Sequence, residues 1–162
     1  VHDLNAIVPG VSRMLQRLVG ETISIQLRLA AHPVGLRGDA AMLEQALLNL
    51  VVNSRDAMPH GGRIVIETST VDLDERTAAQ SAHARPGAFV VLAVSDTGAG
   101  IPPEVLPHIF EPFYTTKEPG KGTGLGLFLV RLLADRVHGR FELTSWPGRG
   151  TTARLEIPIA RG

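Results

Sequence analysis

A narrow polar stripe along an otherwise apolar segment supplies the first groups capable of chemistry. Gln45, Asn49, Asn53 and Asp56 recur every three or four residues within residues 40–57, so on a helix they share one line. Apolar residues cover most of the remaining circumference, which predicts a buried helix. A buried asparagine needs partners for its donors and its acceptor. Asn49 and Asn53 therefore either cap neighbouring loops or bind a polar ligand.

A second candidate group follows the most apolar run of the chain. Residues 88–95 read AFVVLAVS, which is typical of a central strand, and residues 96–101 read DTGAGI. Gly98 and Gly100 permit a tight turn and the close approach of a flat ligand, because they have no Cβ. The Asp96 carboxylate at the strand end is able to accept from an exocyclic amine. A simple strand-ending turn explains the same residues equally well.

A glycine-rich segment, GKGTGLGL at 120–127, opens an apolar stretch that predicts a helix over 123–137. Glycines before a helix N-terminus present free N–H groups and the positive end of the helix dipole, which suits phosphate. The segment is not a Walker loop, because no Gly-Lys-Ser/Thr closes it, and it does not follow a strand as a dinucleotide fingerprint does. A flexible hinge is the alternative.

Between the two glycine segments lies FEPFYTTK, residues 110–117. Phe110 and Phe113 stand three residues apart in a loop flanked by Gly and Pro, which indicates a lid held by two aromatic anchors. Lys117 is placed to supply positive charge to a phosphate. A loop as long as 96–122 inside a compact domain is usually functional or disordered.

The remaining segments predict the elements that hold these groups. Helices are expected over 11–19, where Pro9 and Gly10 prevent a backward extension, over 40–57 with Asp39 as N-cap, and over 123–137. Residues 74–87 predict a loop. The fold class is an α/β (α+β) two-layer sandwich, in which a mixed, mostly antiparallel sheet of about five strands packs against about three helices. The expected strands are 24–29, 63–73, 88–95, 140–145 and 151–157.

Composition limits the classes of partner. The chain has 162 residues, the size of one domain spanning 1–162, and 16 basic against 16 acidic residues. A zero net charge gives no reason to expect nucleic acid or an anionic membrane. Absence of cysteine excludes disulfides and thiolate zinc sites, and no apolar run reaches the roughly 18 residues of a membrane span. Because it begins at Val1, the chain is expected to be part of a longer protein.

Taken together and in order, these segments resemble the catalytic, ATP-binding domain of bacterial sensor histidine kinases, in the GHKL (Bergerat-fold, HATPase) superfamily. EQALLNLVVNSRDAMPHGG at 44–62 is similar to the N box, DTGAGI to the first glycine box and FEPFYTTK to the F box. GKGTGLGL is similar to the second glycine box, and GRGTT at 148–152 to the final Gly-Thr element. The resemblance covers nearly the whole chain and implies a long ATP lid.

The resemblance assigns roles to matching positions and implies ATP and Mg²⁺ as cofactors. Asn53 is implied as the side-chain metal ligand, with Asn49 supporting the phosphates. Asp96 would accept from the adenine amino group, with Thr151 or Thr152 assisting through water. Asn49, Asn53 and Lys117 are implied as catalytic, with Lys117 reaching the γ-phosphate. The full set implied to contact nucleotide is Asn49, Asn53, Asp56, Asp96, Gly98, Gly100, Ile101, Lys117, Gly122, Thr123, Gly124, Leu125, Gly126 and Thr151.

Two positions depart from the family pattern. Many members have a lysine where this chain has Asp56, which leaves Lys117, Arg55 or Lys121 to supply charge to the phosphates. Ser54 stands where alanine is usual. Related chaperone, gyrase and mismatch-repair ATPases place a glutamate base where this chain has Asn49, so hydrolysis by this domain is expected to be slow.

The resemblance implies a cytoplasmic kinase domain that transfers the γ-phosphate to a histidine on a separate dimerisation and acceptor hairpin, upstream of a response regulator. His2 in VHDLN is an unsuitable acceptor, because Pro9 follows too closely for a long acceptor helix. The other histidines make no metal-ligand pattern. The hairpin is expected to be absent and the chain monomeric. The alternatives are a GHKL-type ATPase or anti-sigma-type serine kinase, and a nucleotide-binding regulatory module without catalysis.

Overall fold

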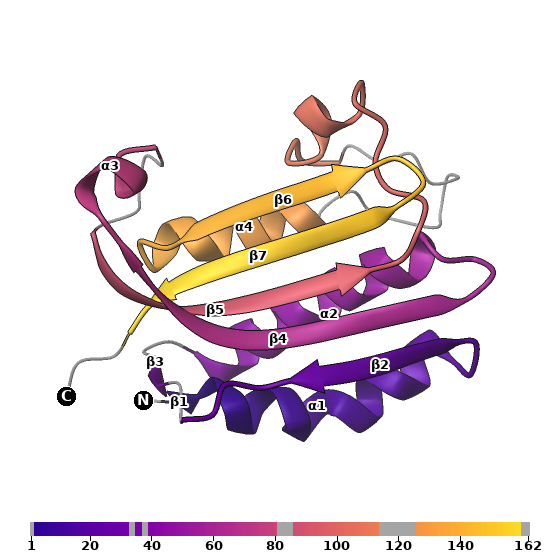
Figure 1. The fold of residues 1–162 in the computed structure, drawn as a ribbon, viewed down its shortest axis with the longest axis horizontal. Helices are drawn as coiled ribbons and strands as arrows, with labels where there is room; N and C mark the ends of the chain where they lie inside the picture. Colours follow the sequence, from indigo (N-terminus) through magenta and orange to yellow (C-terminus); the bar gives the residue numbers. More distant parts are fainter. Residues whose placement is uncertain (1, 33–34, 37–38, 81–85, 114–125, 160–162) are drawn as a thin grey trace.

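The fold is built on a five-stranded sheet that helices cover on one face, and two short strands form a second, small sheet (Figure 1). The computed structural model describes residues 2–32, 35–36, 39–80, 86–113 and 126–159. The main elements are α1 (Leu4–Val19), β2 (Ile23–Arg28), α2 (Ala40–Asp56), β4 (Gly62–Leu73), β5 (Gly87–Asp96), α4 (Gly126–Arg136), β6 (Arg140–Trp146) and β7 (Gly150–Pro158). Smaller elements are β1 (His2–Asp3), β3 (Gly35–Leu36), α3 (Glu75–Ala78) and a 3₁₀ turn at Leu106–His108.

The five strands lie in the order β2-β4-β5-β7-β6. Only β2 and β4 run parallel, and the other neighbouring pairs are antiparallel. The apolar strand β5 is central, as its composition predicts, since a strand buried on both faces loses the alternation of polar and apolar residues. The expected two-layer sandwich with a mixed, mostly antiparallel sheet is confirmed.

The main core fills the space between the sheet and the helix layer. In that layer α2 contacts both α1 and α4 and therefore lies between them (Figure 1). The N-cap predicted at Asp39 is confirmed, because its side chain accepts from the Ala41 amide at 2.9 Å. Leu43, Leu47 and Leu50 are buried. Among the described helices, none combines the length and the apolar character needed to cross a membrane.

The start of α1 corrects the sequence prediction. The helix begins at Leu4, not at residue 11, and Pro9 lies inside it. Asp3 caps the true N-terminus by accepting from the Asn5 amide at 3.0 Å. Leu4 and Val8 are both buried in the main core, and this burial outweighs the backbone hydrogen bond that a proline inside a helix cannot donate. Tertiary packing thus overrides the local stop signal.

The region expected to be a loop over 74–87 contains the short helix α3. Asp74 caps it by accepting from the Thr77 amide at 2.7 Å, a backbone hydrogen bond that lowers the pKa of this exposed carboxyl. Ala78 is the buried residue of this turn. The correction is small, since one helical turn leaves little pattern in a sequence.

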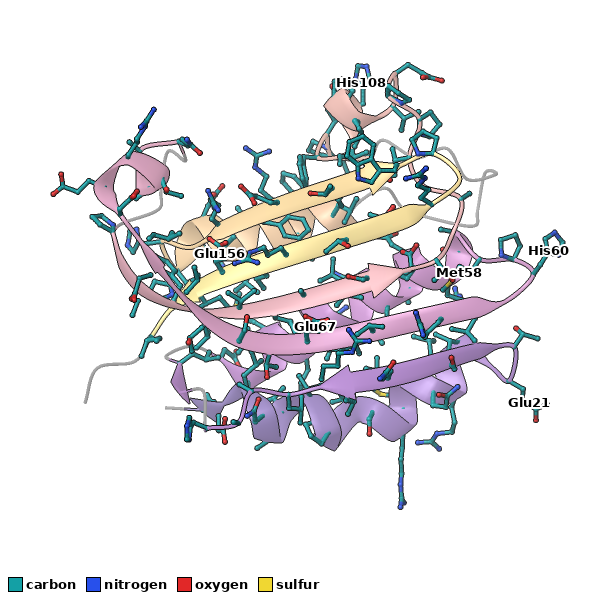
Figure 2. All side chains as sticks on the ribbon, in the orientation of Figure 1. Glu21, Met58, His60, Glu67, His108 and Glu156 are labelled. Atoms are coloured by element: carbon teal, nitrogen blue, oxygen red, sulfur yellow. The ribbon has the colours of Figure 1, made fainter. Side chains whose placement is uncertain are left out.

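The face of the sheet that points away from the helices carries a buried carboxylate (Figure 2). Glu156 is 1 % exposed and alternates along β7 with Leu155 and Ile157, which belong to the helix-side core. Arg140 holds Glu156 through two hydrogen bonds of 3.0 and 3.2 Å, and Arg154 adds a third at 2.8 Å. These contacts tie edge strand β6 to β7.

Glu156→Gln is expected to lower the free energy of unfolding by about 2–3 kcal/mol, because it leaves the Arg140 guanidinium, 13 % exposed, without its main counter-charge. Urea unfolding measures this change. The matched control is Glu67→Gln on the same face of the sheet. The Glu67 side chain is 46 % exposed and that of its partner Arg28 is 56 % exposed, so this variant should lower the free energy of unfolding by less than about 1 kcal/mol. Equal effects of the two variants would contradict the prediction.

Candidate functional site

Three polar side chains form a row across neighbouring strands where β5 ends. Asp96, Thr151 and Ser145 lie on β5, β7 and β6, with Ser145 directly opposite Thr151. The Asp96 Oδ1 oxygen accepts from the Gly98 amide at 2.9 Å and from the Thr151 amide at 3.3 Å. Among the described residues no hydrogen bond to Oδ2 is found. One oxygen of Asp96 is thus fixed by the backbone, and the other has no hydrogen bond to a described residue.

The DTGAGI turn is clamped between α2 and the β6–β7 hairpin. The Ala99 amide donates to the Ala57 carbonyl at 3.0 Å, and the Ala99 carbonyl accepts from the Gly148 amide at 2.7 Å. A Cβ on Gly98 would lie 2.7 Å from the Ala57 carbonyl oxygen. Gly100 has a φ of +75°, and its Cβ would overlap the Trp146 carbonyl oxygen. The two glycines therefore make room for protein backbone, which supports the turn interpretation and fixes the position of Asp96.

The polar stripe of α2 lies beside this turn, since Ala57 directly follows the helix. Asn49 and Asn53 are half-buried. The Gln45 side chain donates to Asn49 Oδ1 at 3.1 Å, and the buried Nδ2 of Asn53 has no hydrogen-bond partner among the described residues. Neither amide is found bonded to a described loop, so loop capping does not explain the stripe in the described part of the chain. An orphaned buried donor is rare and calls for a partner.

The first residue of α4 faces the two asparagines. A Cβ on Gly126 would lie 3.6 Å from Asn53 Nδ2 and 3.9 Å from Asn49 Cβ. Gly126 thus brings the end of the second glycine segment against the stripe. The other candidates on that segment and the lid lie outside the described residues, namely Lys117, Lys121, Gly122, Thr123, Gly124 and Leu125.

Arg55 and Asp56, two candidates near the stripe, contact each other. Arg55 donates to Asp56 Oδ1 at 3.2 Å through both Nε and a terminal nitrogen, and to the Leu18 carbonyl of α1 at 3.4 Å. Arg55 is therefore held toward α1. The other two basic candidates for phosphate, Lys117 and Lys121, lie outside the described residues.

Only one of the two expected aromatic anchors is packed. The Phe110 ring meets Phe141 edge-on at 5.6 Å between centroids, and the Arg131 guanidinium lies 4.7 Å from the Phe110 centroid. Phe113 is 72 % exposed and has a φ of +67°. The prediction of two aromatic anchors therefore holds for Phe110 and is wrong for Phe113, whose side chain is exposed to solvent.

Ser145 is a site residue that the sequence did not predict. Its Oγ accepts from the Ile101 amide at 2.7 Å and lies 2.8 Å from Thr151 Oγ1 and 3.3 Å from the Gly150 carbonyl oxygen. It therefore joins the DTGAGI turn to the Gly-Thr element. The available signal was its register, since a hairpin closed around 147–149 places residue 145 opposite residue 151.

The residues present fit a nucleotide with a magnesium ion. Mg²⁺ bound with nucleotides takes one or two protein oxygen ligands and completes its shell with phosphate oxygens and water. Asn53 offers one amide oxygen on the polar stripe, while its Nδ2 lies next to Gly126. In the described ranges no three His, Cys, Asp or Glu side chains gather into a group that could hold a metal on their own.

A two-layer sandwich with a carboxylate at the end of its central strand and an asparagine stripe on the central helix defines an ATPase domain of the GHKL class. The family model described as histidine kinase-, DNA gyrase B- and HSP90-like ATPase matches residues 38–161. The chain belongs to this family.

The curated relatives include sensor histidine kinases. Sensor kinase CckA of Brucella abortus is 39 % identical over 158 residues, covering 98 % of this chain and 17 % of its own length. Histidine protein kinase DivJ of Caulobacter vibrioides is 33 % identical, covering 98 % and 25 %, and sporulation kinase C of Bacillus subtilis is 32 % identical, covering 98 % and 33 %. The chain thus spans a third or less of the length of these relatives.

Solved structures show the same fold. The catalytic domain of the histidine kinase ThkA superposes with a TM-score of 0.74 at 26 % identity, covering 98 % of this chain and 93 % of that one. The mycobacterial sensor histidine kinase MprB has a TM-score of 0.76 at 22 % identity, covering 98 % and 95 %.

Proposed function

We propose that this chain binds Mg-ATP and transfers the γ-phosphate to a histidine on a separate acceptor hairpin. The observation that carries the proposal is the placement of Asp96 and the α2 asparagines at one end of the sandwich. The turn after Asp96 packs on Ala57, one helical turn beyond Asn53. An adenine acceptor and a metal ligand therefore lie within reach of one nucleotide.

At the adenine end, this chain's own backbone prepares the carboxylate. Two amides hold Asp96 Oδ1, at 2.9 and 3.3 Å, so the orientation of the carboxylate is set before a ligand arrives. Oδ2 is then directed to accept from the amino group of adenine. Such preorganisation reduces the ordering cost of binding.

At the phosphate end, Asn53 would hold the metal through Oδ1, and Asn49 would contact phosphate through its amide NH₂. The Gln45 amide fixes Asn49 in this sense, since it donates to Oδ1 and leaves Nδ2 for a ligand. When bound, Mg²⁺ supplies positive charge against the phosphate oxygens. Gly126 would donate the first amide of α4 at the positive end of that helix.

Transfer is favoured over hydrolysis by the side chain at position 49. An amide takes no proton from water at neutral pH, so residue 49 cannot act as the general base of a fast ATPase. Phosphoryl transfer to an imidazole nitrogen depends mainly on positioning and charge neutralisation. His2 lies in β1, paired with Leu36 of β3, and is no acceptor helix residue. The proposed partners are therefore an acceptor hairpin and a response regulator. We propose that this transfer takes place in the cytoplasm and that the chain alone is monomeric.

Mixing the chain with [γ-³²P]ATP, Mg²⁺ and a purified acceptor hairpin from a sensor kinase of this family is expected to label the hairpin on histidine, with an acid-labile and base-stable bond. The control is the same hairpin with its histidine replaced by alanine. Several hairpins should be tried, because pairing is specific. Nucleotide binding without transfer to any of them would favour the non-catalytic regulatory module, and rapid phosphate release would favour an ATPase.

A further inference from the structure

Ser145 occupies the centre of a hydrogen-bond relay that nothing in the proposed function requires. Its Oγ touches three groups from three segments, the Ile101 amide, the Thr151 hydroxyl and the Gly150 carbonyl. Thr151 in turn touches Asp96 through its backbone amide. Ser145 and Thr151 are both half-buried, at the end of the row that begins at Asp96.

The distances favour one arrangement of the hydroxyl protons. An amide N–H only donates, so Ser145 Oγ accepts from Ile101 at 2.7 Å. The one proton of Ser145 then goes to Thr151 Oγ1, at 2.8 Å, or to the Gly150 carbonyl, at 3.3 Å. O–H···O bonds are formed at about 2.5–3.0 Å, so the shorter contact favours Thr151 as the acceptor of this proton.

The Thr151 hydroxyl then becomes a donor for a ligand. Since its Oγ1 accepts from Ser145, its own hydroxyl proton is free to turn toward a ligand. The same end of the sheet then presents an acceptor, Asp96 Oδ2, beside a donor, the Thr151 hydroxyl. Adenine offers the complementary pair on one edge, because its amino group donates and its N1 accepts. Guanine offers the opposite pair there.

We infer that Ser145 is a positioning residue for base recognition, which orients the Thr151 hydroxyl as a donor toward N1 of adenine, directly or through one water. The inference rests on the proposed function, because it requires the base to lie at Asp96. Ser145 itself does not touch the nucleotide. Its contribution to base recognition therefore depends on a ligand atom, N1, and is separate from its structural hydrogen bond to the Ile101 amide.

The test compares ADP with 1-deaza-ADP, in which a C–H group replaces N1, by isothermal titration calorimetry with Mg²⁺. The wild type is expected to bind ADP about tenfold more tightly than 1-deaza-ADP, the size of one hydrogen bond. Ser145→Ala is expected to bind ADP about tenfold more weakly and 1-deaza-ADP unchanged, so that the preference disappears. Ser145→Thr, which keeps a hydroxyl, should restore the preference.

A matched control is Ser95→Ala. Ser95 Oγ lies 2.9 Å from Thr152 Oγ1, a similar cross-strand hydroxyl pair on the opposite face of the sheet. This variant should retain the ADP preference.

Equal weakening of both ligands in Ser145→Ala would show a merely structural role and overturn the inference. If Ser145→Ala fails to fold, Thr151→Val supplies a second variant, which should abolish the preference for ADP. A wild type that binds ADP and 1-deaza-ADP equally well would also overturn the inference. A wild type that binds neither ligand would refute the proposed function itself.

Discussion

Asn53→Ala is expected to weaken Mg²⁺-dependent binding of ATP analogues by about 100-fold while leaving metal-free binding nearly unchanged. Mutating a residue that only supports a metal ligand typically lowers metal affinity by about 10- to 100-fold, and removing the ligand itself should lower it by at least as much. The adenine end, at Asp96, lies on β5 and does not depend on this side chain. Titration calorimetry in the presence of Mg²⁺ and in the presence of EDTA measures the metal-dependent and the metal-free affinity.

The same variant is expected to leave the stability of the free protein unchanged or to raise it. The buried Nδ2 of Asn53 has no partner among the described residues, and such a group costs about 1–3 kcal/mol. Alanine also has a higher helix propensity than asparagine. A group that binds ligand at the expense of stability gives opposite signs in binding and unfolding, whereas a structural asparagine would lower both.

Gln45→Ala is the control on the same stripe. It removes the donor to Asn49 Oδ1 but no proposed ligand, so the Mg²⁺ dependence should stay within about threefold of the wild type. A loss of stability in Asn53→Ala, or a Mg²⁺ dependence equal to that of the wild type, would contradict the proposed metal site.

The layers of the fold could be predicted because each main element has its own local pattern. The alternation in β2, the continuous apolar run of β5 and the Asp39 cap of α2 all point to the structure observed. Pro9 misled because the burial of Leu4 and Val8 is a property of the assembled core and leaves no local signal at the helix start.

The site divides in the same way. Asp96 and the α2 stripe could be found from residue type and spacing. Ser145 could not be found from residue type, since its role arises from three partners on separate segments. The sequence suggested that Gly98 and Gly100 permit a tight turn or the approach of a flat ligand. In the structure the absence of a Cβ at these positions makes room for the Ala57 and Trp146 carbonyls. Long-range contacts are what a sequence pattern lacks.

Asp96→Asn should weaken ADP binding by about 100-fold and shift the preference of the site toward GDP. The Gly98 and Thr151 amides both need an acceptor, so the asparagine oxygen takes the place of Oδ1. Its NH₂ group then stands where Oδ2 stood and presents a donor to the amino group of adenine. Two facing donors leave both unpaired, which is how hydrogen-bonding sites reject the wrong ligand. The O6 oxygen of guanine accepts from the same NH₂.

Calorimetric titrations of ADP and GDP check this prediction, with Asp39→Asn as the matched control. Asp39 also accepts from a backbone amide, that of Ala41, but caps α2 on a separate segment, so its variant should bind ADP like the wild type. The free Asp96→Asn protein should keep its stability, since both amides retain an acceptor. An unchanged ADP affinity in Asp96→Asn would show that the carboxylate only closes the turn and does not select the base. A changed preference with unchanged stability would instead establish that Oδ2 selects the base.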